Sequence, residues 1–251
     1  MNFSDIVKVP YTTIPRMQKY EGDLLVQPAS QIHLNEKRKE LLWEKSLKNI
    51  DPNFGLSFAS DLARARKLIK KTSNILGFGN INHIVELCSN IQEDLVIMDH
   101  GRISAACVCF PSGWNPFTAQ GKTLEQIHAP VADGDTLRKM SDKLSHLMCG
   151  EHRYHRYVWT VTTNKYLSAH PFYKRSPASS INDLWFRQEH QITFPIQKNY
   201  TSGFLIDVSV CPLTFLSNEQ QELIRKSINS MSDNVLKYKH LEDIKLLINT
   251  N

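Results

Sequence analysis

The sequence predicts an α+β fold in which helices at both ends of the chain flank an antiparallel sheet. Three observations lead to this prediction. Apolar residues recur at helical spacing before residue 90, strand-like stretches fill residues 91–213, and helical spacing returns in residues 214–251. We therefore expect a single domain over residues 1–251, with a helical part at 1–90, a sheet-containing core at 91–213 and C-terminal helices at 214–251.

The helical part begins with two helices, expected at residues 34–50 and 57–78. Asp51, Pro52, Asn53 and Gly55 supply the break between them. A further helix is expected at residues 81–90.

The core begins with a hairpin, because the stretches DLVIMD and ISAACVCF are joined by the polar turn HGR. The second of these stretches is so rich in small apolar residues that we expect it inside a sheet. The remaining core elements are expected as a helix at 136–148 and strands at 154–163, 184–195 and 203–213.

The C-terminal part begins with a helix capped by Ser217, with Gln220 at the capping-box position. A final helical stretch is expected at residues 237–248.

Composition excludes several classes of protein. The longest apolar runs fall well short of the roughly 20 residues that a membrane span requires, and the N-terminus does not resemble a signal peptide, so we expect a cytoplasmic protein that does not enter a membrane. The five cysteines are odd in number and dispersed, which favours buried thiols over disulfides or an iron–sulfur cluster.

The net charge of +5 comes mainly from two basic stretches, residues 36–48 and 63–73. In both, the basic residues alternate with apolar ones at helical spacing, which favours the solvated face of a helix over a nucleic-acid site. The stretch HRYHRY at residues 152–157 leaves three interpretations open: a solvated edge strand, a nucleic-acid contact, or a partner for the carboxylates of a cofactor.

An unusual density of Pro, Gly and Trp follows the hairpin, in the stretch CVCFPSGWNPFTAQGKTLEQIHAPV at residues 107–131. Here His128 has Leu124, Ile127 and Pro130 as apolar neighbours. A neutral imidazole in an apolar wall is a suitable axial ligand for haem iron, although a lone histidine is also common as a purely structural residue.

Polar residues also interrupt the strand expected at 184–195. Because side chains alternate along a strand, Arg187, Glu189 and Gln191 share one face and His190 lies on the other. This stripe is either the wet face of an antiparallel sheet or a cluster in which a carboxylate holds an ammonium and a guanidinium holds a carboxylate.

Five motifs in the same order resemble the haem-dependent oxidative N-demethylase family: QEDL at 92–95, CFPSGW at 109–114, the GxxLxxIHxPV pattern at 121–131, RxExQ at 187–191 and MSDNVLKYKHL at 231–241. The resemblance runs from about Met17 to Leu241, and FPSGW followed by IHxPV is its most specific part.

The resemblance implies a PAS-like antiparallel sheet that binds haem b and receives electrons from NAD(P)H through a separate flavin and iron–sulfur reductase. It implies a monooxygenase that uses dioxygen to oxidise the methyl carbon of a small secondary amine and releases formaldehyde. No nucleic-acid partner is implied.

The resemblance also assigns roles to residues. His128 corresponds to the motif histidine and is the expected axial ligand, although His155 and His190 remain alternatives. Glu189 is expected to bind the substrate ammonium, with Arg187 a partner for a haem propionate or for Glu189. The expected cofactor-binding residues are Trp114, Asn164, Arg187 and Arg156.

Four positions depart from the family pattern, namely Thr162, Lys165, Gln120 and His190. All but Lys165 lack a cation that the pattern would place there, and Arg153, Arg156 or Lys165 could supply the charge instead. These departures keep open a second hypothesis, a haem-binding PAS-like sensor or carrier without turnover.

Overall fold

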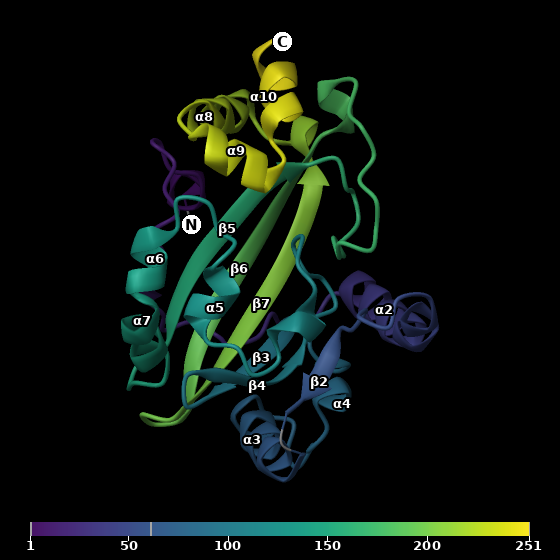
Figure 1. Cartoon of the computed structure of the whole chain (residues 1–251), viewed down its shortest axis with the longest axis vertical. Helices are drawn as coiled ribbons and strands as arrows, with labels where there is room; N and C mark the ends of the chain where they lie inside the picture. The colour runs from purple at the N-terminus through teal and green to yellow at the C-terminus, as the bar shows by residue number, and fades with distance from the viewer. Residues whose placement is uncertain (1, 61, 251) are drawn as a thin grey trace.

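The computed structural model describes residues 2–60 and 62–250 (Figure 1). Within them the chain forms one seven-stranded sheet with the order β1-β5-β6-β7-β3-β4-β2, and every neighbouring pair is antiparallel. This confirms the α+β prediction. The strands are β1 (Gln18–Lys19), β2 (Ser57–Ala59), β3 (Asp94–Asp99), β4 (Arg102–Cys107), β5 (Tyr154–Thr162), β6 (Trp185–Gln197) and β7 (Thr201–Pro212).

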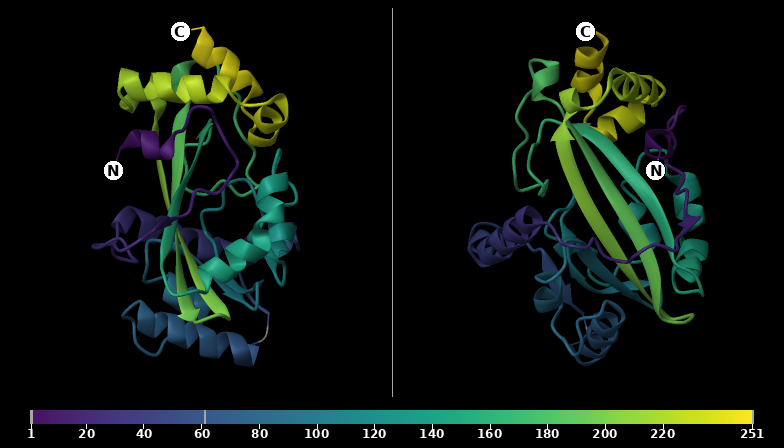
Figure 2. Two further views of the ribbon diagram at one scale, coloured as in Figure 1. Left: turned by 90° about the vertical axis from the view of Figure 1, so that its left-hand side faces the viewer. Right: turned by 180° about the vertical axis from the view of Figure 1, so that it is seen from behind.

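Helices cover both faces and one end of this sheet (Figures 1 and 2). They are α1 (Phe3–Ile6), α2 (Gln31–Ile50), α3 (Leu62–Ile75), α4 (Ile84–Cys88), α5 (Leu124–His128), α6 (Asp135–Lys139), α7 (Ser141–Met148), α8 (Asn218–Asn229), α9 (Asp233–Lys239) and α10 (Glu242–Asn249). Apolar side chains of α5 and α7 pack on one sheet face, those of α3 and α4 on the other, and α8–α10 close the end where β7 finishes.

Strand register decides which polar residues face which helices. Glu189 of β6 lies opposite Val158 and Val208, whereas His190 lies opposite Tyr157 and Asp207. Opposing residues share a face, so the two neighbours on β6 point to different sides of the sheet.

The side of Glu189 is the side of α5. Thr193, four pairs along from Glu189 on β6 and therefore on the same face, lies opposite Phe204, which clusters with Leu124 and Ile127 of α5. We call this side the α5 face and the other the α4 face.

Three expected helices differ from the observed elements. Residues 57–59 form strand β2, because Phe58 pairs with Ala106 at the edge of β4, a contact that local spacing cannot reveal. The helix expected at 136–148 is divided at Met140 into α6 and α7. The last stretch is divided at His240, which adopts a left-handed conformation with φ 54°.

Other predictions of local structure are confirmed. Ser217 caps α8 and forms the predicted capping box with Gln220. The five thiols are free, and all but that of Cys211 are buried. None of the described helices is both long enough and apolar enough to cross a membrane.

Candidate functional site

His128 is the last residue of α5, a five-residue helix fixed by a capping box between Thr123 and Gln126. Its Nδ1 lies 2.7 Å from the carbonyl oxygen of Leu124, one turn earlier. A carbonyl only accepts hydrogen bonds, so Nδ1 carries the ring proton and Nε2 keeps its lone pair. No hydrogen bond from a described residue reaches Nε2, which leaves this atom available as a ligand.

The surroundings keep this imidazole neutral. Burial lowers the pKa of His128 to about 4, and the nearby Arg156 guanidinium acts in the same direction, against the opposing effect of the Leu124 carbonyl. At pH 7 the ring is therefore uncharged, which is the form that binds a metal.

Glu189 stands at the centre of a chain of hydrogen bonds on the α5 face. One carboxylate oxygen accepts a very short hydrogen bond from the Ser112 hydroxyl, and the other accepts from Gln191 Nε2 at 2.5 Å. Ser112 Oγ accepts from Arg187 Nε at 2.6 Å, and Gln191 Oε1 accepts from Arg156 Nε at 2.6 Å. Each oxygen of Glu189 is thus linked to a guanidinium through a neutral side chain.

The predicted face of this stripe is confirmed, but its interpretation as a wet surface is wrong. Arg187, Glu189 and Gln191 are exposed by only 2%, 8% and 7%. Polar side chains that are this deeply buried require hydrogen-bond partners, and the network of hydrogen bonds around Glu189 provides them.

Arg187 also fixes the loop that follows β4. Its Nη2 donates to the carbonyl of Phe110 at 2.8 Å and its Nη1 to that of Leu167 at 2.7 Å. Burial lowers the pKa of Arg187 to about 10, so the side chain remains charged at pH 7. Its link to Glu189 passes through Ser112, and its other N–H groups hold two loops together.

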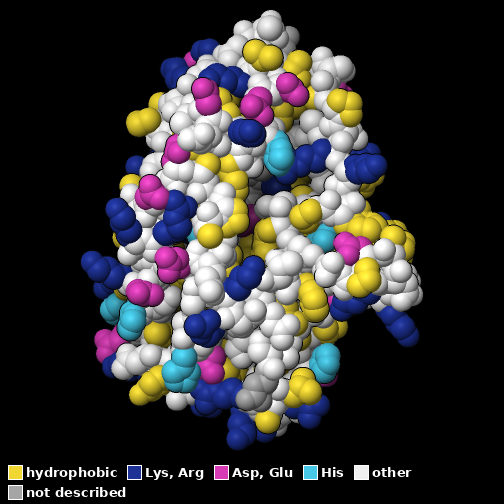
Figure 3. Space-filling view, in the orientation of Figure 1, with side chains coloured by type: hydrophobic (Ala, Val, Ile, Leu, Met, Phe, Trp, Pro, Cys, Tyr) yellow, Lys and Arg dark blue, Asp and Glu magenta, His cyan; other side chains and the backbone are white. Residues whose placement is uncertain are grey.

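A hollow lies over strands β5–β7 on the α5 face, between α5 and α9 (Figure 3). Lys239, the last residue of α9, has its ammonium 2.9 Å from the carbonyl of Trp159 and 5.5 Å from the ring centre of Tyr11. Burial lowers the pKa of Lys239 to about 8, against the attraction of Glu189. Burial also raises the pKa of Tyr11 to about 12.

Of the two remaining predicted cofactor-binding residues, Trp114 lies near His128, whereas Asn164 binds its own loop. Trp114 is half-buried and packs in the same apolar cluster as Leu124 and Ile127, beside His128. Asn164 accepts from the amide of Tyr166 at 2.9 Å and donates to the carbonyl of Ser168 at 2.8 Å, so its side chain holds its own loop.

The alternative axial ligands lie elsewhere. His155 and His190 point to the α4 face, where Nδ1 of the first is 2.9 Å from Nε2 of the second. Each ring therefore has a nitrogen engaged by the other, and neither belongs to the hollow beside His128.

Three cations were expected to replace those that the family pattern places elsewhere. Of these, Arg156 belongs to the hydrogen-bond network of Glu189, because it donates to Gln191. Arg153 instead donates to the carbonyl of Gly22 at 3.3 Å, and the Lys165 ammonium lies 5.5 Å from the ring centre of its neighbour Tyr166.

Sequence reasoning overlooked Ser112, Lys239 and Tyr11. The first two lie inside the motifs CFPSGW and MSDNVLKYKHL, so their place in these motifs was an available signal. Tyr11 precedes every motif, and nothing local marks it.

The donor set fits a haem better than a metal ion held by protein ligands alone. Across residues 2–60 and 62–250, no three His, Cys, Asp or Glu side chains gather as a metal site would require. A single neutral imidazole with a free Nε2, with Arg156 near His128 and both Arg156 and Lys239 near Glu189, matches a porphyrin that supplies its own four nitrogen ligands and carries anionic propionates.

Comparison with known families agrees with this chemistry. A family model described as haem-dependent oxidative N-demethylase, alpha subunit-like, matches residues 59–248. The match omits residues 17–58, over which the resemblance was also expected. No curated protein matches the chain.

Proposed function

The chain belongs to the haem-dependent oxidative N-demethylase alpha subunit-like family, and from this premise we propose that it is a haem-dependent monooxygenase. It binds haem b and demethylates a small secondary amine, with dioxygen as oxidant and NAD(P)H as the source of electrons through a separate flavin and iron–sulfur reductase. For dimethylamine the products are methylamine, formaldehyde, water and NAD(P)⁺. The observation that supports this proposal is the free Nε2 of a neutral His128 beside the hollow.

The haem, when bound, supplies the redox chemistry, and the chain supplies ligation, charge and exclusion of water. His128 would ligate the iron through Nε2, since the Leu124 carbonyl holds its Nδ1. Arg156 and Lys239, two cations near Glu189, would balance the charge of the propionates. Trp114 forms part of the apolar wall.

Glu189 binds the protonated amine. An ionised carboxylate has about four acceptor sites, and Ser112 and Gln191 use two of those on Glu189. The remaining sites can accept N–H groups of a substrate ammonium. Both hydrogen-bonding partners of Glu189 are neutral, and Arg187 and Arg156 hold those partners in position.

The first test is the absorption spectrum of the purified protein with haem, for wild type and His128→Ala. We expect a Soret band in wild type and its loss in the variant, because His155 and His190, the alternative ligands, face the other side of the sheet.

His146→Ala is a matched control, since His146 Nδ1 also lies 2.7 Å from a carbonyl one turn earlier, that of Asp142, but its side chain is exposed on α7. It should keep the Soret band. A band that survives in His128→Ala, or is lost in His155→Ala or His190→Ala instead, would refute the ligand assignment.

The second test is Glu189→Gln, which removes the charge but keeps the shape. We expect amine affinity to fall about 10- to 100-fold, the range for a hydrogen bond to a charged group, while the haem spectrum stays intact. Titration of the Soret band with dimethylamine measures this affinity. Loss of haem from the variant would contradict the role of Glu189 in substrate binding.

A second function, a haem-binding sensor or carrier without turnover, has one observation in its favour. Asn164, the one residue kept from a motif of the expected pattern, uses both its amide oxygen and its amide nitrogen to bind its own loop. Incubation with a reductase, NAD(P)H and amine separates the two functions. An oxygenase releases formaldehyde, whereas a sensor or carrier shows only a ligand-dependent change in its spectrum.

A further inference from the structure

A second cavity lies on the α4 face, on the side of the sheet opposite to Glu189. Its volume is about 330 Å³, at the lower end of the range for small-molecule sites. The segment before α2 crosses this face behind β5–β7 and forms the outer wall (Figure 2, right). The lining residues are Tyr20, Asp23, Leu24, Leu25, Val26, Gln27, Glu93, His190, Ile192, Leu205 and Asp207.

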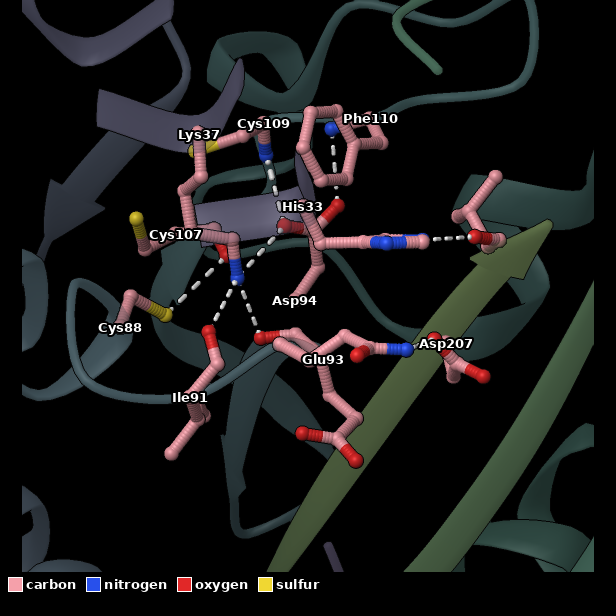
Figure 4. A network of polar contacts seen from close by, with 12 residues as sticks. His33, Lys37, Cys88, Ile91, Glu93, Asp94, Cys107, Cys109, Phe110 and Asp207 are labelled. Carbon is pink, nitrogen blue, oxygen red and sulfur yellow. Dashed lines mark hydrogen bonds and ion pairs between the residues drawn. The ribbon is translucent and has the colours of Figure 1, made fainter. Parts of the chain in front are cut away.

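Glu93 brings a buried carboxylate to this cavity without a compensating cation. The residue is 2% exposed; Oε1 accepts from the amide of Val26 at 2.5 Å, and Oε2 has no hydrogen-bond partner among the described residues. Lys37 forms no ion pair with this carboxylate, because its ammonium binds Asp94 and the backbone carbonyl of Glu93, the latter at 2.6 Å, and its attraction is the smallest influence on the Glu93 pKa. Figure 4 shows the Glu93 carboxylate turned away from that ammonium.

Asp207 adds a second carboxylate to the lining. Its Oδ1 accepts from Gln92 Nε2 at 2.7 Å, a neutral donor. Burial, supported by the negative charge of Asp207, raises the pKa of Glu93 to about 7, against the hydrogen bonds of the carboxylate and the weaker attraction of Lys37. An unpaired buried carboxylate is costly, and a bound cation would remove this cost.

Aromatic and apolar groups complete the walls. The Tyr20 ring lies 5.7 Å from that of His190, and Tyr157 stacks on His190 at 4.5 Å. Burial and the neighbouring His155 lower the pKa of His190 to about 4, so at pH 7 this ring does not repel a cation. Ring faces near carboxylates are the surroundings in which proteins bind organic ammonium ions.

We propose that this cavity is a binding site for a small organic ammonium ion, held by Glu93 and Asp207 and packed against Tyr20 and His190. A metal ion is a poorer match, because no cluster of three metal-ligating side chains is found in the described parts of the chain. The site is separate from the hollow at His128 and does not depend on the function proposed for it.

The test is a titration of the full-length protein with tetramethylammonium chloride, followed by NMR of the histidine Cε1–H signals. The His190 signal is assigned from His190→Phe. We expect it to shift saturably in wild type, because its ring lines the cavity. The uncharged tert-butanol, of similar shape, should cause no comparable shift.

Variants on the two faces separate this site from the first one. Glu93→Gln should weaken tetramethylammonium binding at least tenfold, Asp207→Asn should weaken it in the same direction, and Glu189→Gln on the α5 face should leave it unchanged. The proposal is overturned if the His190 signal does not move, if tert-butanol moves it equally, or if neither Glu93→Gln nor Asp207→Asn weakens the effect. Loss of the Soret band or of turnover leaves this result unaffected.

Discussion

At the scale of single residues, both proposed sites contain titratable side chains whose pKa values are shifted by burial. His128 and Glu93 are the clearest cases, because burial drives the first toward its neutral form and holds a proton on the second up to about pH 7. Both lie where we propose that a ligand binds, and strongly shifted pKa values are common at such sites.

Glu93 gives a prediction for the pH dependence of stability. Its pKa is about 7 in the folded protein and 4.5 as an ordinary glutamate, so the folded state holds an extra proton between these values. Its ionisation therefore lowers the free energy of unfolding as pH rises through this window, and the loss is complete above pH 7.

Glu93→Gln removes this loss while keeping an acceptor for Val26. We expect the variant to be more stable than wild type at pH 8 by up to about 3 kcal/mol, with the difference vanishing near pH 4. Urea denaturation without added cations at both pH values measures it. The exposed Glu151→Gln should show no comparable gain, and a gain of equal size at both pH values would contradict the argument.

At the scale of elements, the β6–β7 hairpin keeps the two proposed sites on opposite faces of the sheet, since the neighbouring residues Glu189 and His190 of β6 point to opposite sides. The packing of this hairpin depends on Gly203, which lies opposite Phe194. A Cβ at Gly203 would lie only 2.2 Å from Cζ of the Phe194 ring, and that ring is 1% exposed. The hairpin therefore requires glycine at this position.

Gly203→Ala should destabilise the protein by about 1–3 kcal/mol, the usual range for overpacking a core. Urea denaturation measures this cost. In the double variant with Phe194→Leu, which makes room, the cost of the alanine should fall. Equal costs in both backgrounds would show that the ring contact is not the cause.

At the scale of the whole molecule, a fully buried ion pair joins α2 to the sheet (Figure 4). Lys37 Nζ lies 3.4 Å from Asp94 Oδ1, and both side chains are 0% exposed. Burial is the largest single influence and acts to lower the pKa of Lys37, but the attraction of Asp94 together with that of three neighbouring thiols outweighs it, so the pKa is raised. Asp94 also accepts from the amides of Cys109 and Phe110 at 3.0 and 2.8 Å.

The pair thus connects a helix outside the family match to the loop that carries Ser112. Lys37→Met should cost about 3–5 kcal/mol, because it leaves the Asp94 charge buried and unpaired. Lys39→Met, at a half-exposed position of the same helix, should change stability by less than about 0.5 kcal/mol. Urea denaturation compares the two, and equal costs would contradict the role of the pair.

Much of the secondary structure could be predicted from the sequence because apolar spacing is a local property. Helix α2, the β3–β4 hairpin and strands β5–β7 lie where spacing placed them, and the two faces of β6 were correct. Burial was harder to predict. Lys37 was assigned to a solvated helix face, yet it is fully buried. Its burial depends on the ion pair with Asp94, which lies 57 positions further along the chain.

What the sequence determined by itself was the alternation and spacing that define strands and helices, together with the motifs that identify the family and single out His128 and Glu189. Tertiary structure alone decided the partners. It placed Ser112 between Arg187 and Glu189, paired His155 with His190 on the opposite face, and left Glu93 without a cation. The physical reason is that periodicity follows from one segment, whereas charge compensation requires groups that only folding brings within a few ångströms.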